Sequence, residues 1–204
     1  MKFYDCEMAP SPRRVSLFIA EKGADIETVQ IDLHSREQFG EAFQKINPDC
    51  VVPALELDDG SVITEVIAIC DYIEAKFPEP PLMGSTDEER ARILMWNAKI
   101  EQQGFSAVGD VFRNTVKGFK DRALTGLDAY AQLPELAERG RSRVQAFYRR
   151  LDGQLAINEF VAGDAYSMAD ITGRVSVDFA VRAKMPVPED ATNLQRWHEV
   201  VSAR

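Results

Sequence analysis

The sequence has few residues able to form disulfides or bind metals. Its three cysteines, Cys6, Cys50 and Cys70, are widely spaced and include no Cys-x-x-Cys pair. This pattern argues against a disulfide framework and is typical of proteins in a reducing cytoplasm. The two histidines, His34 and His198, are far apart and lack ligand spacing. We therefore expect no metal site.

Long apolar runs and basic runs are also missing. No uncharged apolar stretch reaches the roughly 18 residues that a membrane span needs, and Asp5 and Glu7 interrupt the N-terminus before a signal-peptide core forms. The net charge is −9, whereas a nucleic-acid binder needs a basic face. We interpret Arg139, Arg141 and Arg143 as one solvated helix face. The expectation is a cytoplasmic protein with no membrane and no nucleic-acid partner.

What remains is an ordinary folded composition, with 45% hydrophobic and 28% charged residues in 204. A chain of this length can bury a sizeable core without disulfides. Strands are expected over 2–6 and 26–31 with a helix over 11–23 between them, which is the order of a parallel βαβ unit. Because Ser11 precedes Pro12, we predict that Ser11 is the N-cap of this helix and Pro12 its first residue.

The following segment predicts a short helix, a hairpin and another helix. The short helix ends near Asn47-Pro48, and a strand over 51–57 is entered through Pro53. A turn of Asp58-Asp59-Gly60-Ser61 leads to a return strand over 62–64. Apolar residues then recur on one face of a helix that starts at Glu65.

Composition changes at 78–88, where three prolines and a glycine form a stiff linker. We place the domain boundary there, giving domains of 1–80 and 81–204. The second domain is helical in pattern, and residues 118–134 are ambiguous. Helices are expected over 87–115, 136–157, 168–184 and from 192 to the C-terminus. Ser167 and Asp170 have the spacing of a capping box at the start of one of them.

Several short motifs occur along the chain, and together, in their order, they resemble the glutathione S-transferase family. The residues that carry the resemblance are Arg14-Val15, Glu21-Lys22-Gly23, Asn47-Pro48, Val52 to Gly60, Thr64-Glu65, Pro78 to Leu82, and Gly163 to Ile171. The resemblance covers nearly the whole chain. It implies an α/β thioredoxin-like N-terminal domain that binds glutathione, followed by an all-α C-terminal domain that binds a hydrophobic electrophile. Relatives are usually homodimers, so a homodimer is expected.

Pro53 is the first site residue that the resemblance implies. In the family the bond before this proline is cis, which turns the backbone of the preceding residue, here Val52, toward the ligand. The cysteinyl part of glutathione can then pair with that backbone like an added strand. From the sequence alone a trans proline opening an edge strand would be favoured.

Glu65 and Val66 are implied to hold the γ-glutamyl carboxylate of glutathione. They lie at a helix start, where free N–H groups and partial positive charge favour an anion. Relatives have serine where this chain has Val66. Valine at this position removes a hydroxyl contact but keeps the backbone N–H. We therefore expect binding of the carboxylate to be weaker by about 1 kcal/mol.

Ser11 is the candidate catalytic residue, because serine-type relatives place there a hydroxyl that stabilises the glutathione thiolate. The alternative is that Ser11 only caps its helix. Tyr4 is a rival donor, but its place inside a strand favours a core role. Cys6 and Cys50 would matter only in a cysteine-based redox protein.

The glycine carboxylate of glutathione is assigned to Gln38, with Arg36 and Lys45 as alternatives. Arg13 and Arg14 either steer the anionic tripeptide or face solvent. The second substrate is expected against the helix over 87–115. Its candidate wall residues, equally plausible as core, are Met95, Phe105, Val108 and Phe112.

Three functions remain open at this point. The first is a glutathione transferase acting on an electrophile or a peroxide. The second is a non-catalytic binding or regulatory protein, since a fold can persist where its chemistry is lost; Val66 favours this interpretation. The third is a thiol-disulfide redox protein that uses Cys6 or Cys50.

Overall fold

The computed structural model describes residues 1–204, which form two compact units. The first unit contains Met1–Pro81 together with Thr125–Asp128, and the second contains Leu82–Leu124 together with Ala129–Arg204. Each unit has its own core, and we describe each by itself.

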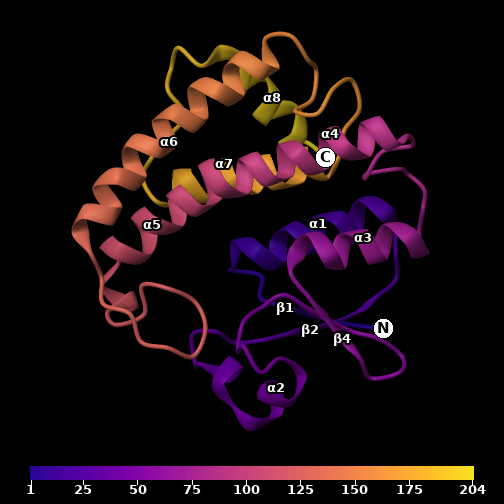
Figure 1. Ribbon diagram of the computed structural model, residues 1–204, viewed down its shortest axis with the longest axis vertical. Coiled ribbons are helices and arrows are strands. Elements are labelled where there is room, and N and C mark those ends of the chain that lie inside the picture. Colours follow the sequence, from indigo (N-terminus) through magenta and orange to yellow (C-terminus); the bar gives the residue numbers. More distant parts are fainter. The chain divides into compact units, whose positions relative to one another are not determined.

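The first unit is a four-stranded sheet with helices on both faces (Figure 1). Its elements are β1 (Lys2–Asp5), α1 (Pro10–Lys22), β2 (Glu27–Gln30), a 3-10 turn (Glu37–Phe39), α2 (Glu41–Ile46), β3 (Ala54–Glu56), β4 (Val62–Thr64) and α3 (Val66–Lys76). The strand order is β2-β1-β3-β4, with β1 parallel to β2 and the other pairs antiparallel. Helices α1 and α3 cover one face and α2 the other. This confirms the predicted thioredoxin-like fold.

Alternation along β1 supplies a core on each face of the sheet. Tyr4 packs with Phe43 of α2, their ring centres 5.9 Å apart. Phe3 points to the opposite face, as neighbouring strand residues do, and is paired in register with Leu55. Tyr4 and Phe3 are both buried, so β1 anchors the α2 side and the α1–α3 side at once.

The start of α1 differs from the prediction. Ala9, in extended conformation, is the N-cap, Pro10 is the first helical residue, and no side chain caps the helix. Ser11 is therefore inside the first turn and is not a cap. Two prolines make this start ambiguous in the sequence, because Pro10 and Pro12 both suit a first turn whose N–H groups have no helical acceptor.

The second unit is built of helices. Its elements are α4 (Asp87–Ile100), a π-helical turn (Glu101–Phe105), α5 (Ser106–Thr115), a 3-10 turn (Lys117–Phe119), α6 (Pro134–Leu155), α7 (Met168–Arg182) and α8 (Thr192–Ser202). This confirms the predicted all-α second half. None of the helices has the length and apolar character needed to cross a bilayer. The Ser167–Asp170 pair forms the predicted capping box at the start of α7.

The helix expected over 87–115 is present but is interrupted by the π-helical turn. A Cβ on Gly104, within that turn, would lie 2.7 Å from the Phe147 ring of α6. A Cβ on Gly140 of α6 would likewise lie 2.8 Å from the carbonyl oxygen of Ala107. Glycine at both positions therefore allows α6 to approach the α4–α5 segment closely.

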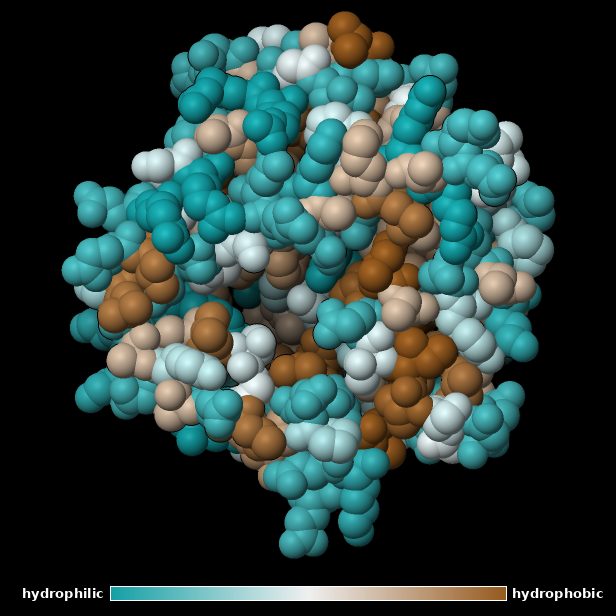
Figure 2. Space-filling view, viewed as in Figure 1, coloured by the Kyte–Doolittle hydropathy of each residue, from teal (hydrophilic) through white to brown (hydrophobic).

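The solvated face predicted for α6 is only partly correct. Arg139 and Arg141 are exposed, and hydrophilic side chains cover much of the face shown in Figure 2. Arg143 instead forms an ion pair with Asp110 of α5 at 2.9 Å and donates to the Gln102 carbonyl. It therefore links α6 to the α4–α5 segment, a contact between elements that the local charge pattern does not reveal.

Candidate glutathione-binding site

Strand register brings the predicted site residues of the first unit to one edge of its sheet. Tyr4 is paired with Ala54, and Ala54 with Thr64. The residues beyond these pairs, namely the loop from β1 into α1, the Val52-Pro53 segment and Glu65, therefore leave the sheet at the same edge. The carboxyl end of β2 lies there too, because Gln30 pairs with Asp5. The segment that contains Gln38 begins at this end of β2.

The Val52–Pro53 bond is cis, as the family resemblance implies. Pro53 is buried and Val52 is half-buried. The Asn47 side chain holds the approach to this bond by donating to the Val51 carbonyl at 2.8 Å. No backbone hydrogen bond within the chain engages Val52. Its N–H and C=O are thus available to an extended peptide.

Glu65 is the N-cap of α3 and has φ 68° and ψ 126°. Positive φ is unusual for a residue with a side chain, and such strained positions cluster at ligand sites. The first turn of α3 contains no acidic residue, so its free N–H groups keep their attraction for an anion. The Val66 side chain is buried, which leaves its backbone N–H as its available polar group.

Ser11 lies at the positive end of α1, in a first turn that contains no acidic residue. Its side chain is half-buried. Arg14, one turn later and buried, donates to Ser11 Oγ at 3.4 Å. Because the hydroxyl accepts this bond, its proton can be donated elsewhere. The contact was missed in the sequence, although the i, i+3 spacing of the two residues allows it.

Tyr4 does not offer a free hydroxyl. It donates to the Glu56 carboxylate at 2.7 Å. Burial, together with the hydrogen bond and the negative charge of Glu56, raises the pKa of Tyr4 to about 12. Its proton is therefore committed to Glu56, which agrees with the core role favoured for Tyr4.

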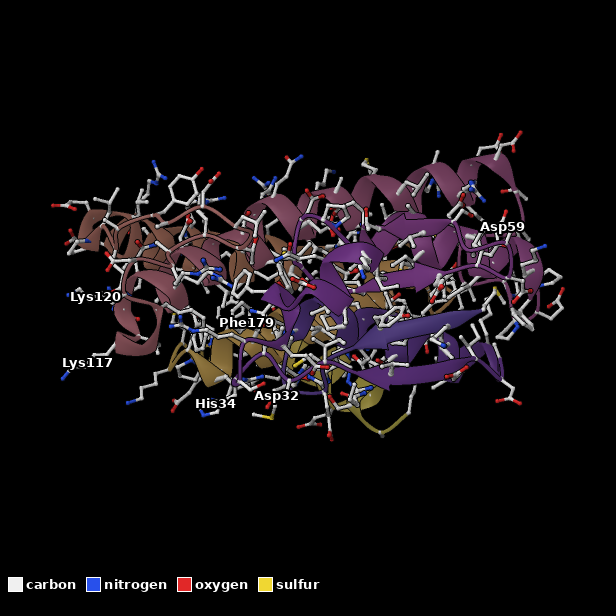
Figure 3. The ribbon with its side chains drawn as sticks, turned by 90° about the horizontal axis from the view of Figure 1, so that it is seen from below. Asp32, His34, Asp59, Lys117, Lys120 and Phe179 are labelled. Atoms are coloured by element: carbon white, nitrogen blue, oxygen red, sulfur yellow. The ribbon has the colours of Figure 1, made fainter.

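Gln38 lies in the 3-10 turn after β2, and its Oε1 is buried without a hydrogen-bond partner. Asp32 orders this loop by accepting from the backbone N–H groups of His34 and Ser35 at 2.8 and 3.2 Å (Figure 3). Bonds from Ser35 and His34 hold the pKa of Asp32 below its usual range. Since amide oxygen and nitrogen are assigned from their surroundings, the unengaged amide of Gln38 can face a ligand with either group.

The cysteines are poorly placed for covalent chemistry. Cys6, Cys50 and Cys70 are free thiols, and all three are buried. The Cys50 thiol donates to the Pro48 carbonyl at 3.6 Å. Reactive cysteines are usually partly exposed and surrounded by positive charge, so burial disfavours the redox interpretation. No group of three or more His, Cys, Asp or Glu side chains is arranged to hold a metal ion.

The wall residues proposed in the second unit have different environments. Val108 is fully buried and belongs to the core, and Met95 is 44% exposed on α4. Phe105 and Phe112 are half-buried, and both rings pack against Phe179 of α7, with centres 5.6 and 5.3 Å away. Phe105 and Phe112 are thus the two candidates that can present an aromatic surface.

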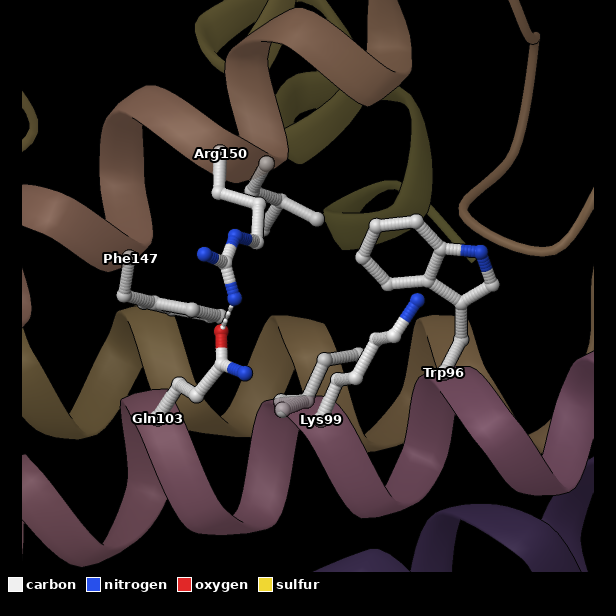
Figure 4. Close-up of a pocket in the computed structure, with 7 residues that line it drawn as sticks. Trp96, Lys99, Gln103, Phe147 and Arg150 are labelled. Atoms are coloured by element: carbon white, nitrogen blue, oxygen red, sulfur yellow. Dashed lines mark hydrogen bonds between the residues drawn. The ribbon is translucent and has the colours of Figure 1, made fainter.

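A shallow recess between α4 and α6 is already filled by its own side chains (Figure 4). Lys99 Nζ lies 4.6 Å from the centre of the Trp96 ring. Arg150 donates to the side-chain oxygen of Gln103. These mutual contacts leave little room, and we assign no ligand to this recess.

The residues gathered at this sheet edge of the first unit can together bind an extended anionic peptide. It combines an unpaired backbone segment at Val52, the first turns of two helices without acidic residues, and a hydroxyl at Ser11. Glutathione is such a peptide, with a carboxylate at each end and a thiol between them.

Comparison with known proteins also connects the chain with glutathione. Residues 9–76 match the model of the glutathione S-transferase N-terminal domain, and residues 117–204 match that of the C-terminal domain. Glutathione S-transferase 2 of Saccharomyces cerevisiae is 34% identical, and the match covers 100% of this chain and 86% of that protein.

Solved structures are similar over the whole chain. A glutathione S-transferase domain-containing protein of Marinobacter aquaeolei has 37% identity and a TM-score of 0.92, covering 100% of this chain and 98% of that one. A glutathione S-transferase of class Gtt2 from Vibrio parahaemolyticus has 36% identity and a TM-score of 0.85, covering 100% and 94%. On this evidence of sequence and fold, the chain belongs to the glutathione S-transferase family and uses glutathione as its co-substrate.

Proposed function

We propose that this protein is a glutathione transferase in which Ser11 activates the glutathione thiol for attack on an electrophile or a peroxide. The observation that carries the proposal is the gathering of Ser11, the cis Val52–Pro53 bond and Glu65 at one sheet edge. A hydroxyl that donates to sulfur at the positive end of a helix favours the thiolate over the thiol. Tyr4 does not compete, because its proton is held by Glu56.

In this proposal, residues 1–80 bind glutathione and residues 81–204 bind the second substrate. The Val52 backbone pairs with the cysteinyl part, with Pro53 setting its direction. The N-terminus of α3 at Glu65 and Val66 takes the γ-glutamyl carboxylate on its backbone N–H groups, since the first turn after Glu65 contains no acidic residue. The Gln38 amide takes the glycine carboxylate.

Replacing Ser11 with alanine is expected to leave glutathione binding intact and lower kcat/KM by about 100-fold, the usual cost of losing one donor to a developing anion. Glutathione binding is measured by calorimetric titration, and activity with a chlorodinitrobenzene. The pH dependence of thiolate absorbance in the complex should also move to higher pH, because the variant no longer donates to the sulfur.

Two matched variants make this test specific. Ser16→Ala removes another α1 hydroxyl, one that donates to the Pro12 carbonyl at 3.2 Å, and should keep its activity. Tyr4→Phe removes the rival hydroxyl and should not change the thiolate titration. If Tyr4→Phe lost activity and Ser11→Ala did not, Tyr4 would be the residue that activates the glutathione thiol.

The alternative function is a non-catalytic binding or regulatory protein, and Val66 is the observation that favours it. Its buried side chain replaces the serine that relatives use at this place. If several-millimolar glutathione produced no heat with the wild-type protein, this alternative would be preferred. A cytoplasmic location is part of both proposals, since all three cysteines are free thiols.

We also propose a homodimer, and α4 offers a surface for it. Leu94 and Met95 are neighbouring apolar residues, 37% and 44% exposed. Replacing both with glutamate should convert a dimer into a monomer in sedimentation velocity, because burying two carboxylates in an interface is costly. The matched control is Val200→Glu on α8, also an exposed apolar position. A wild-type protein that sediments as a monomer would contradict the proposal.

A further inference from the structure

Arg113, in the last turn of α5, is a half-buried cation without a carboxylate partner. Its guanidinium lies 4.8 Å from the centre of the Phe119 ring and donates to the Arg122 carbonyl at 3.0 Å. Asp110, one turn earlier, is instead paired with Arg143. Burial, and secondarily the positive charge of Arg122, lower the pKa of Arg113. The site therefore favours an anion that would compensate this charge.

A row of aromatic rings leads away from this guanidinium. Phe119 packs on Phe112 with ring centres 5.3 Å apart, and Phe112 packs on Phe179 at 5.3 Å. Phe105 also packs on Phe179, with ring centres 5.6 Å apart. Phe105, Phe112 and Phe119 are each partly exposed. They form an apolar surface suited to a flat ring, because aromatic rings favour offset or edge-to-face contact.

The surroundings of Arg113 are basic although the whole chain is acidic. Between Arg113 and Arg122, Lys117 and Lys120 add two further positive charges against the single acidic residue Asp121. Both lysines are exposed and project outward at the end of the helical unit (Figure 3). In a protein of net charge −9, this segment is a local positive region that attracts an anion.

We propose that Arg113 and the row of Phe119, Phe112 and Phe105 form the second-substrate site, and that this site selects an aromatic electrophile bearing a carboxylate. The planar guanidinium can hold a carboxylate through two parallel hydrogen bonds, while the rings contact the aromatic part. This inference rests on the proposed transferase function and adds a specificity-determining residue to it.

The test compares two electrophiles that differ by one carboxylate, a chlorodinitrobenzene and a chlorodinitrobenzoate. In both reactions the glutathione sulfur bonds to the ring carbon and the carbon–chlorine bond breaks. Chloride leaves with the electron pair, and the thiol proton passes to solvent. The readout is the ratio of kcat/KM for the benzoate to that for the neutral compound.

Arg113→Gln should lower this ratio by roughly 10- to 100-fold, the range for hydrogen bonds to a charged group. Arg113→Lys should lose less, because it keeps the charge but not the planar fork. The matched control, Arg139→Gln, removes the same charge from an exposed site on α6 and should leave the ratio unchanged. An equal fall with both substrates, or an unchanged ratio in Arg113→Gln, would overturn the inference.

A binding measurement separates this inference from the proposed function. Equilibrium dialysis with unreactive dinitrobenzoate and dinitrobenzene requires no turnover. Wild-type protein should bind the benzoate more tightly, and Arg113→Gln should lose that preference. If neither electrophile reacts but the preference is present, the transferase proposal fails and the anion site stands. If both react and the preference is absent, the anion site fails alone.

Discussion

Replacing Asp170 with alanine should lower the free energy of unfolding by about 4 kcal/mol, because several buried donors would lose their acceptor at once. The carboxylate is fully buried at the start of α7. Its Oδ1 accepts from the Val161 N–H and the Trp197 indole N–H, both at 2.9 Å. Its Oδ2 accepts from the Ser167 N–H and hydroxyl, both at 3.0 Å.

The size of this effect is the balance of two opposing terms. Burial raises the pKa of Asp170 while the four donors oppose that shift. Part of the stabilisation by the hydrogen bonds therefore only offsets the cost of removing the charge from water. Alanine removes the charge but leaves four buried donors without a partner, at about 1–3 kcal/mol for each one left unsatisfied. Because such losses do not add fully, the expected effect of about 4 kcal/mol lies at the low end of the sum for four donors.

Urea denaturation followed by circular dichroism measures this change. Asp164→Ala is the matched control, because Asp164 is an exposed aspartate in the same segment and its loss should change stability by less than about 0.5 kcal/mol. Asp170→Asn keeps the shape but places an amide nitrogen among donors, so it should recover only part of the loss. A change below about 1 kcal/mol in Asp170→Ala would mean that water replaces the carboxylate at little cost.

Local patterns predicted the element order, whereas tertiary contacts decided the departures from it. The alternating residues of β1 and the turn before β4 are local features, and both elements are where the sequence places them. The strand expected over 51–57 is reduced to Ala54–Glu56, because Pro53 lacks the N–H that a ladder needs. The π-helical turn beside Phe147 depends on a residue that is distant in sequence.

The glutathione-binding residues could be found through family resemblance but not through spacing. Ser11, Val52 and Glu65 lie 41 and 13 positions apart, and only the sheet register brings them to one edge. The sequence contained a sign of the Arg113 site, because basic residues cluster between 113 and 122 in an acidic chain. What it could not reveal is that Arg113 lacks a carboxylate partner, since Asp110 is drawn to Arg143 of another helix.

Lys22 is the second position where one substitution should have a large effect. Its side chain is fully buried at the end of α1, and its Nζ lies 2.5 Å from Glu74 Oε2 of α3. The same ammonium donates to the carbonyls of Pro78 and Pro80 in the linker after α3. One cation therefore joins α1, α3 and the linker.

We expect Lys22→Met to lower the free energy of unfolding by about 3–5 kcal/mol, the usual result of removing one partner of a buried ion pair. Methionine fills a similar volume, so the loss reports the charge and its hydrogen bonds more than a cavity. Lys76→Met is the matched control on α3, where the lysine is exposed and its charge should contribute less than about 1 kcal/mol.

The double variant Lys22→Met with Glu74→Leu decides whether the pair itself stabilises the fold. Most of the cost of Lys22→Met is expected to come from the Glu74 carboxylate left beside a buried methionine, so removing that carboxylate should restore much of the stability. If the double variant is as unstable as the sum of the single variants, the two side chains act independently. The decisive contacts of Lys22 would then be those to the linker carbonyls, and the lysine would act by fixing the chain where the first unit ends.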